Sequence, residues 1–327
     1  MPAIGNQSLT LADHAKRQDP NGKVAKIVEI LGQTNEILTD MLWLEGNLAT
    51  GHRTTVRTGL PSATWRLLNY GVPKGKSTTA QITDACGMLE TYSEIDCALA
   101  NLNGNTAEFR LSEDRAFLEG MNQLMATTLF YGNQSVNPER ITGLAPRFNQ
   151  LSATNGVNVI DGGGVGSDNT SIWIVVWGDQ SCHGVFPKGS KAGLSHTDKG
   201  QQTVLDADGN QFEAYRTHFK WDAGLTLRDW RYVVRIANID VSDLAGATPA
   251  NLINLLIRAV HKVPNTRMGR PAIYCNRAVA TWLDIQALNK ANVNLRYAEV
   301  FGEEVLTFRK IPIRICDSIV NNESRVV

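Results

Sequence analysis

The sequence predicts an α+β fold in which helices and strands occupy separate segments of the chain. Apolar residues recur every three or four positions over residues 106–130, which is the spacing of one long helix. Residues 46–83 form a polar, alternating stretch broken by Gly and Pro, which is typical of an extended two-stranded ribbon. After residue 150, strand-like and helix-like segments alternate, so we expect a mixed sheet with helices packed on it.

The first segments of the chain are polar or only weakly helical. Residues 1–20 have few apolar positions, and we expect them to form an irregular arm. Residues 23–41 have apolar residues at helical spacing, but a central glycine lowers the helix propensity. In the ribbon, Trp65, Leu67 and Tyr70 are interpreted as part of a strand. Because an isolated two-stranded ribbon is only marginally stable in water, the pattern predicts a partner surface that covers it.

The long helix is predicted to bury one stripe of side chains. At 1.5 Å per residue it would be about 35–40 Å long, enough to span a small domain. Gly132 and Asn133 can end it, and Pro138 prevents it from continuing. The residues of the stripe are Phe117, Leu118, Met121, Leu124, Met125 and Leu129.

The second half of the chain alternates between strand and helix signals. Residues 151–201 are interpreted as rich in loops, with one buried strand at 172–177, where nearly every residue is apolar. Asp208-Gly209 predicts a hairpin. The further expected elements are a strand at 230–239, a helix that opens at Thr248-Pro249, a strand at 271–275, a helix capped by Asn276 that ends near residue 290, and one strand at 305–317 with Pro312 inside it.

The composition argues against several functional classes. The chain has 327 residues, 43% of them hydrophobic, and its 32 basic residues balance its 32 acidic ones. We therefore do not expect a protein that binds nucleic acid through its overall charge, since nucleic-acid-binding proteins of that kind carry an excess of Lys and Arg. No apolar run approaches the roughly 18 residues of a membrane span, and no signal-peptide stretch is seen, so we expect no membrane partner. The five cysteines lack metal or redox spacing and are expected to be free thiols in a cytoplasm.

Three segments resemble reactive or ligand-binding motifs, but each lacks a necessary part. The glycine run at 161–167 lacks the lysine and the following helix of a phosphate loop. The acidic residues around Asp208 lack the twelve-residue frame of a calcium loop. Cys182 and His183 are neighbours, so their side chains point apart, and no third residue orients them. We therefore predict no catalytic, cofactor-binding or metal-binding residues and no enzymatic activity; a cytosolic hydrolase using Cys182 or Cys275 is the alternative from another class.

The charged residues form two adjacent blocks of opposite sign. Residues 46–83 include five basic residues and no acidic ones, whereas residues 84–114 include seven acidic residues and one basic residue. Complementary fields of this kind set the register between docked copies, so we predict that the ribbon of one subunit lies over the acidic surface of the next. Two independently solvated faces are the alternative. The predicted contact residues are Arg53, Arg57, Trp65, Arg66, Lys74 and Lys76 on the ribbon, and Glu90, Glu94, Asp96, Glu108, Glu113 and Asp114 on the acidic surface.

Two segments resemble a known family. The long helix, its glycine turn and the segment from Pro138 to Gly143-Leu144 are similar to the spine helix of tailed-phage major capsid proteins and the turn that leaves it. The Ile-Pro-Ile segment that precedes Asp317 is similar to the late strand that returns beside the spine in capsid proteins of the Hong Kong 97 type. The likeness covers most of the chain. It is closest to coat proteins of short-tailed phages, with that of a Bordetella phage as one candidate, over residues 53–70 and 219–240.

The resemblance implies a Hong Kong 97-type phage capsid fold with a long spine helix, a mixed-sheet axial domain, a peripheral domain and an extended β-ribbon loop. The implied parts are an N-terminal arm (1–45), the extended loop (46–85), the peripheral domain with the spine helix (86–148), the axial domain (149–290) and a return strand to the peripheral domain (291–327).

The implied function is that of a major capsid protein, which self-assembles as pentamers and hexamers into an icosahedral shell around double-stranded DNA. The shell would contact the DNA without sequence specificity, and a decoration protein and a portal would be further partners. Assembly would take place in the host bacterial cytoplasm, and the protein would end in the virion capsid. The alternative that shares the fold is the shell of an encapsulin-like compartment, which would enclose enzymes.

Overall fold

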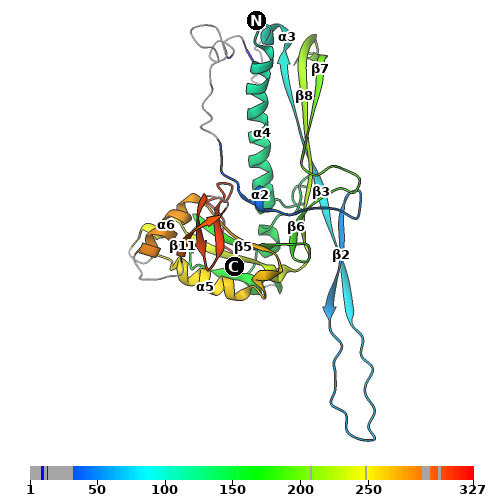
Figure 1. Ribbon diagram of the computed structural model, residues 1–327, viewed down its shortest axis with the longest axis vertical. Helices are drawn as coiled ribbons and strands as arrows, with labels where there is room; N and C mark the ends of the chain where they lie inside the picture. Colours follow the sequence, from blue (N-terminus) through cyan, green and yellow to red (C-terminus); the bar gives the residue numbers. More distant parts are fainter. Residues whose placement is uncertain are drawn as a thin grey trace.

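A long helix and a long β-ribbon point in opposite directions from a layered αβ domain (Figure 1). The computed structural model describes residues 9–10, 13, 32–102, 104–152, 154–206, 208–246, 249–288, 295–300 and 303–327. Most of the expected N-terminal arm, the first part of the helix expected at 23–41, and Thr248 lie outside the described residues. The part of that helix that is described is α2 (Ile37–Asp40).

The helix predicted at 106–130 is confirmed as α4 (Thr106–Tyr131). Its buried residues are concentrated in the second half, and Leu124, which we assigned to the buried stripe, is 42% exposed. Gly132 ends the helix with its N–H bonded to the Thr128 carbonyl and its φ at −54°, so it is not a left-handed cap. A Cβ at this position would lie 2.6 Å from that carbonyl oxygen, and glycine is therefore needed for close approach.

A sheet of long strands lies beside α4, and one of its strands continues into the ribbon. β3 (Thr78–Asp96) pairs with β2 (Gly51–Gly59) at one end and with β8 (Gln211–Leu227) at the other. β8 also pairs with β7 (Leu194–Leu205), which confirms the hairpin predicted at Asp208-Gly209. Because β3 is continuous, the ribbon is an extension of the sheet beside α4 rather than a separately attached arm.

The ribbon ends in a long loop, residues 60–77, which has no strand. Our interpretation of Trp65, Leu67 and Tyr70 as strand residues is therefore wrong. Pro61 and Pro73 have no N–H to donate, and no neighbouring strand of the described chain offers a partner for this segment. These apolar side chains are therefore exposed on a loop and do not belong to a paired strand.

The central sheet of the layered domain is built around β5 (Asn169–Trp177), in which all nine residues are buried. β5 lies between β9 (Val233–Asp240) and β10 (Arg270–Cys275), antiparallel to both. Its apolar residues at 172, 174 and 176 pack in one cluster with α5 (Leu252–Lys262) and α6 (Arg277–Leu288). Those at 173, 175 and 177 pack in a second cluster with the end of α4, which explains why the strand is apolar on both faces.

The segment 151–201 is more ordered than predicted. Besides β5 it contains β4 (Val159–Asp161), which pairs with β9, and β6 (Cys182–Phe186), which pairs with β8 and β1 (Trp43–Glu45). The remaining short elements are α3 (Cys97–Ala100) and the 3-10 turns Ala145–Phe148, Thr154–Asn158, Trp230–Tyr232, Asp243–Ala245 and Thr266–Met268. The sequence prediction failed here because β4 and β6 are short, and β6 carries His183 and Gly184, which are not typical of a strand.

The end of the chain differs from the prediction in two ways. The strand expected at 305–317 is a hairpin of β12 (Glu303–Phe308) and β13 (Ile311–Ile315), because Arg309 and Lys310 both have positive φ, 49° and 69°. β12 also pairs with β11 (Leu295–Val300). β13 runs parallel to β10 of the central sheet, and the tail after it, not the strand, reaches the end of α4.

A further difference concerns the start of α5. Asn251 is the N-cap residue, with its side chain accepting a hydrogen bond from the Asn254 backbone N–H, instead of the predicted Thr248-Pro249. The cap predicted at Asn276 is confirmed, since its Oδ1 accepts from the Val279 N–H at 2.9 Å.

Candidate assembly surfaces

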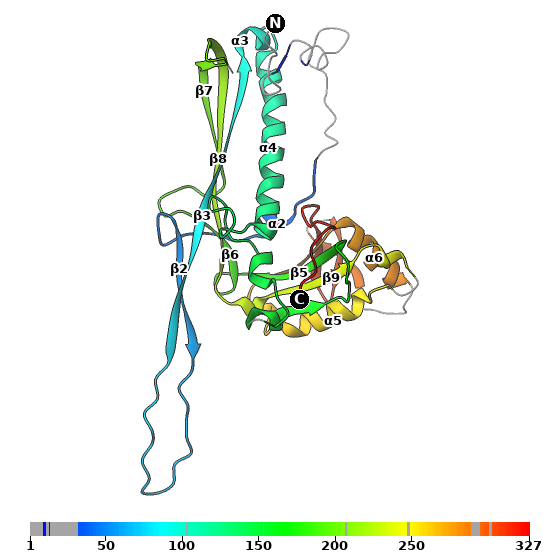
Figure 2. The ribbon, with the colours of Figure 1, turned by 180° about the vertical axis from the view of Figure 1, so that it is seen from behind.

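The loop at the end of the ribbon exposes a group of large apolar side chains. Each of them is at least 60% exposed, and Trp65 is fully exposed. Figures 1 and 2 show that the loop points away from the rest of the described subunit, so no other described segment covers it. A cluster of exposed apolar side chains is typical of a surface that binds another molecule. The residues are Leu60, Trp65, Leu67, Leu68, Tyr70 and Val72.

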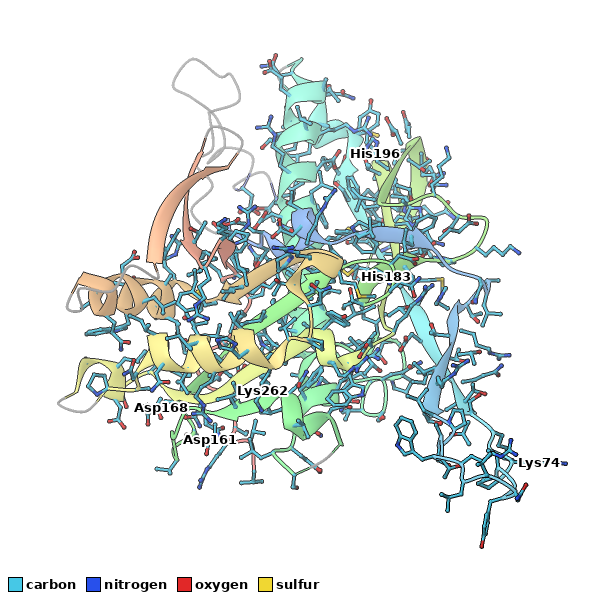
Figure 3. The ribbon with its side chains drawn as sticks, turned by 60° about the horizontal axis from the view of Figure 1, so that its bottom comes forward. Lys74, Asp161, Asp168, His183, His196 and Lys262 are labelled. Atoms are coloured by element: carbon cyan, nitrogen blue, oxygen red, sulfur yellow. The ribbon has the colours of Figure 1, made fainter. Side chains whose placement is uncertain are left out.

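The five basic residues predicted as contacts lie along the same ribbon and loop. Arg53 donates from Nε to Thr83 Oγ1 at 3.3 Å, and Arg66 donates from Nε to the Tyr70 carbonyl at 2.9 Å. Lys74 projects from the far end of the loop (Figure 3). In the part of the chain that the structure describes, no carboxylate forms an ion pair with Arg53, Arg57, Arg66, Lys74 or Lys76.

Three of the predicted acidic contact residues, Glu90, Glu94 and Asp96, bind specific groups inside the subunit. Glu90 contacts Lys220 at 3.4 Å and Glu94 contacts Arg216 at 2.8 Å, because β8 places basic residues opposite them. Burial acts to raise the pKa of Glu90, but hydrogen bonds, including one from Lys220, outweigh it and lower the pKa. Asp96 accepts from the Ala98 N–H and caps α3. The sequence could not show this pairing, because β8 lies more than 100 residues later.

The other predicted acidic residues lie on the first turns of α4. Glu108 is in the first turn, and Glu113 and Asp114 follow on the next. The structure therefore distributes the acidic block over two elements, and only the α4 group lies at the end of the spine. Docking of the basic ribbon on these residues stays a prediction.

A groove that the sequence did not reveal runs between α4 and β3. It consists of two hollows of about 240 and 410 Å³, which share Leu89 of β3 and Leu124 of α4. Gly87 and Gly120 open it, because neither carries a side chain that could fill the space. These two glycines are the sequence signal that could have indicated it. The rest of the lining is mostly apolar and includes Phe117, Met121, Met125 and Ala223.

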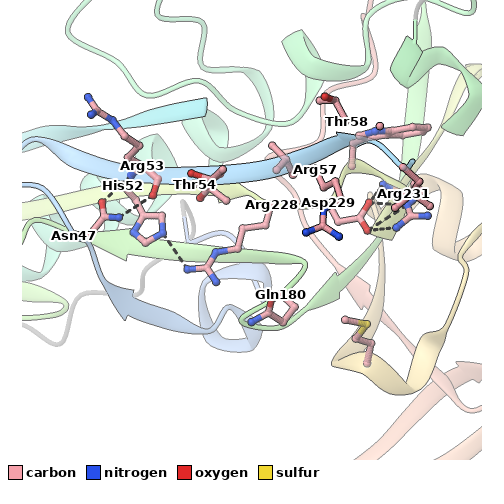
Figure 4. Close-up of a pocket in the computed structure, with 16 residues that line it drawn as sticks. Asn47, His52, Arg53, Thr54, Arg57, Thr58, Gln180, Arg228, Asp229 and Arg231 are labelled. Atoms are coloured by element: carbon pink, nitrogen blue, oxygen red, sulfur yellow. Dashed lines mark hydrogen bonds and ion pairs between the residues drawn. The ribbon is translucent and has the colours of Figure 1, made fainter. Parts of the chain in front are cut away.

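Another hollow, of about 770 Å³, lies between β2 of the ribbon and the segment 228–231 (Figure 4). Its walls carry Arg53, Arg57, Arg228 and Arg231 and a single acid, Asp229. Asp229 forms an ion pair with Arg231 at 2.7 Å. The hollow is therefore positively charged, as is the loop at the other end of the ribbon.

A pair of histidines lies beside this hollow. His52 of β2 contacts Arg228 at 3.0 Å and stacks edge-on against His183 of β6, with 5.8 Å between ring centroids. His183 is fully buried. Burial lowers the pKa of His183 to about 4, with Arg228 and His52 adding to the effect against the opposing charge of Asp179.

The residues considered for chemistry do not form a reactive site. Burial raises the pKa of the Cys182 thiol to about 12 and also raises that of Cys275, so neither is a thiolate near neutral pH. The glycine run at 161–167 joins two strands and precedes no helix. Within the described residues there is no cluster of three His, Cys, Asp or Glu side chains that could hold a metal ion, and no helix that could span a membrane.

Comparison with known proteins identifies the family. The profile of the family described as Major capsid protein GP7 matches residues 19–327. The chain belongs to this family of major capsid proteins. A chain of the bacteriophage Epsilon15 structure is 37% identical, with a TM-score of 0.80, over 100% of this chain and 99% of that one.

Two more distant structures show a weaker likeness. The bacteriophage JBD30 capsid chain aligns with 89% of this major capsid protein and 92% of its own length at 9% identity and a TM-score of 0.51, a likeness of fold alone. An encapsulin from Synechococcus elongatus reaches a TM-score of 0.43 at 10% identity, over 70% of this chain and 96% of its own. None of the curated proteins compared with the chain matches it.

The major capsid protein thus has the Hong Kong 97-type phage capsid fold, as predicted, and its role is structural and not enzymatic. It is a component of the virion capsid. The division into five parts and the contact residues named from the sequence stay predictions, as does an origin in a Bordetella phage.

Proposed function

We propose that this major capsid protein assembles as pentamers and hexamers into an icosahedral shell that encloses double-stranded DNA. The observation that supports this most is the ribbon, whose loop exposes six large apolar side chains that the described subunit leaves uncovered. A surface of this kind is unfavourable in water and favours association. An uncovered arm on one side of each copy, and its acceptor on another side, make a heterologous contact, which closes into rings.

The contact that we propose joins the ribbon of one subunit to the α4-bearing surface of the next. The ribbon carries Arg57 and Arg66 without an ion-pair partner in the described chain, and α4 begins with acidic residues. Complementary charges orient the two copies and prevent wrong registers, while burial of apolar side chains supplies affinity. The balanced total charge of the chain suits this arrangement, because many neighbouring copies would otherwise repel one another.

The shell would contact packaged DNA without sequence specificity. The chain has equal numbers of basic and acidic residues, so its contacts with phosphates would be local and not part of a global basic face. A portal at one vertex and a decoration protein on the surface would be the remaining partners. Assembly would take place in the host bacterial cytoplasm.

Charge reversal on the ribbon tests the proposed contact. The double variant R57E/R66E should remain folded, because neither side chain is buried, but it should not form particles. The matched control K191E/K199E changes the net charge equally at exposed positions on and before β7 and should assemble normally. Circular dichroism measures folding, and negative-stain microscopy counts particles. Normal particles from R57E/R66E would contradict the proposed contact.

The contents of the particles separate the phage shell from an encapsulin-like compartment. Particles purified from infected cells should contain nuclease-protected double-stranded DNA. An enclosed enzyme in place of DNA would favour the compartment.

A further inference from the structure

We propose that His52 and His183 form an acid-sensitive joint, which holds the start of β2 against the body of the subunit at neutral pH and releases it when the histidines are protonated. The body is here the central sheet with β6 and the segment 228–231. The joint lies within one subunit, so the inference goes beyond the proposed shell function and does not depend on which surface the ribbon meets.

The two strands of the ribbon are attached to the body in different ways. β3 continues from the ribbon into the sheet beside α4, where its second half pairs with β8 along the whole stretch from Cys86 to Asp96. Among the described strands, β2 pairs with β3 alone. The side of β2 that faces the body therefore has no backbone ladder, and side chains make the connection there.

The connecting side chain is His52, which is buried at the start of β2. Arg228 Nη2 lies 3.0 Å from His52 Nε2 (Figure 4). A guanidinium has no acceptor, so Arg228 donates this hydrogen bond and His52 Nε2 accepts it. The proton of the neutral ring is therefore on Nδ1, which is buried without a partner in the described chain. A proton added to Nε2 would remove the acceptor and break the bond to Arg228.

His183 supplies the second half of the joint from β6. Its ring meets that of His52 edge-on, and its side chain is fully buried in the body (Figure 3). The Gly178 backbone lies close enough to favour the charged ring, but neither ring nitrogen has a hydrogen bond of good geometry among the described residues. The site thus accommodates a neutral ring and offers little to stabilise an imidazolium.

The charges around the pair are balanced before any proton arrives. Asp84 of β3, the cross-strand neighbour of His52, contacts Arg147 at 2.9 Å. Asp179, in the turn before β6, contacts Arg228 at 3.1 Å. Protonation of either histidine would therefore add an unbalanced positive charge to a buried site. The remaining charged side chains that line the adjoining hollow are Arg53, Arg57, Asp229 and Arg231.

The direction of the pH effect follows from burial. Burial and the charge of Arg228 lower the pKa of His52, as they do that of His183. In the open joint both rings reach water, where the pKa of histidine is about 6.5. The open form therefore binds more protons below pH 6.5, and each histidine favours opening by up to about tenfold per pH unit until the pKa of the closed form is reached. Above pH 6.5 both rings are neutral and the joint stays closed.

A distance measurement across the hollow tests the joint. Spin labels are attached to the variant T55C/Q180C, whose two positions are exposed on opposite walls, and their separation is measured by double electron–electron resonance in dilute subunits. We expect one narrow distance at pH 7.5 and a longer, broader distribution at pH 4.5 that reverses on neutralisation. The body pair Q180C/D243C should keep its distance, and labelled wild type gives the background from the native cysteines.

Variants that cannot titrate supply the control. H52Q/H183F places an amide oxygen where it can accept from Arg228 and an uncharged ring in the buried site, and it should keep the pH 7.5 distance at pH 4.5. H52Q alone retains the buried His183 and should show a smaller change than the wild type.

Three results would overturn the inference. The first is a wild-type distance that is the same at both pH values. The second is a change in H52Q/H183F or in H52Q that equals the wild-type change. The third is a simultaneous change in the body pair or in the far-ultraviolet circular dichroism, since the loss of structure would then be global. None of these depends on whether particles form, so the shell function is tested separately.

Discussion

Arg235 and Glu323 form a buried ion pair, with 2.9 Å between Nη2 and Oε2 and only 5% of each side chain exposed. Arg235 also donates to the Phe148 carbonyl at 2.8 Å and, through Nε, to Ser171 Oγ at 3.0 Å. Glu323 accepts a second hydrogen bond from the Tyr131 hydroxyl at 2.5 Å. The pair thus joins β9 of the central sheet, the C-terminal tail and the last residue of α4, and it fixes the long helix relative to that sheet.

Removing the acid of this pair should strongly destabilise the subunit. Glu323→Leu leaves the Arg235 charge buried without a partner, and we expect a loss of about 3–5 kcal/mol in the free energy of unfolding. Urea unfolding of unassembled subunits measures it. The control is R235M/E323L, which removes both charges and should lose clearly less than the single variant. Equal losses would show that the unpaired charge of Arg235 is not what destabilises Glu323→Leu.

Acid should destabilise the subunit through His183. Its pKa is lowered from 6.5 to about 4 in the folded chain, so the unfolded chain binds more protons between these values. The free energy of unfolding should therefore be unaffected above pH 6.5 and fall by about 3 kcal/mol as the pH drops to 4. Unfolding curves at several pH values measure it.

The variant His183→Phe supplies the control for the acid effect, because it cannot titrate. The unfolding free energy of the wild type minus that of His183→Phe should be about 3 kcal/mol lower at pH 4 than at pH 7. A difference that stays constant with pH would assign the acid sensitivity to other groups.

The close approach of two segments at the end of α4 requires glycine. A Cβ at Gly143 would lie 2.6 Å from the Thr128 carbonyl oxygen and 2.7 Å from that of Leu129, and Gly143→Ala should cost about 1–3 kcal/mol. In contrast, a Cβ at Gly120 meets nothing within 4 Å, so Gly120→Ala in the helix interior should gain about 1 kcal/mol. Chemical unfolding of both variants tests this. Similar effects in the two would contradict the packing argument.

The thiols should be unreactive in the folded chain. Cys182, Cys275 and Cys316 are buried, and burial raises the pKa of each. At pH 8 a colorimetric thiol reagent should therefore modify at most the two half-buried cysteines quickly, and all five after unfolding. Rapid modification of Cys182 or Cys275 in the native protein would contradict this and support the alternative of a hydrolase that uses one of these cysteines.

The elements with strong local signals were predictable from the sequence. α4 was predicted to within one residue, because its apolar spacing and its glycine stop agree. β5 and the Asn276 cap were predicted for the same kind of reason. Predictions failed where the residue types do not reveal the backbone conformation. One strand was expected at 305–317, and the hairpin there depends on two residues with positive φ, neither of which is glycine.

The assembly surfaces were predictable only in part. The uncovered ribbon follows from its composition, but the pairing of Glu94 with Arg216 depends on a strand 122 residues later in the chain. The ion pair of Arg235 spans 88 residues, so an arginine inside an apolar strand signals a buried charge without naming its partner. The groove depends on which face of α4 borders β3, which local periodicity does not specify.

Microscopy of the purified chain tests the central claim most directly. The account predicts closed polyhedral particles of uniform size above a threshold concentration, with the loop of each subunit in contact with its neighbour. A chain that stays monomeric at every concentration, with Trp65 shielded by its own subunit, would contradict it.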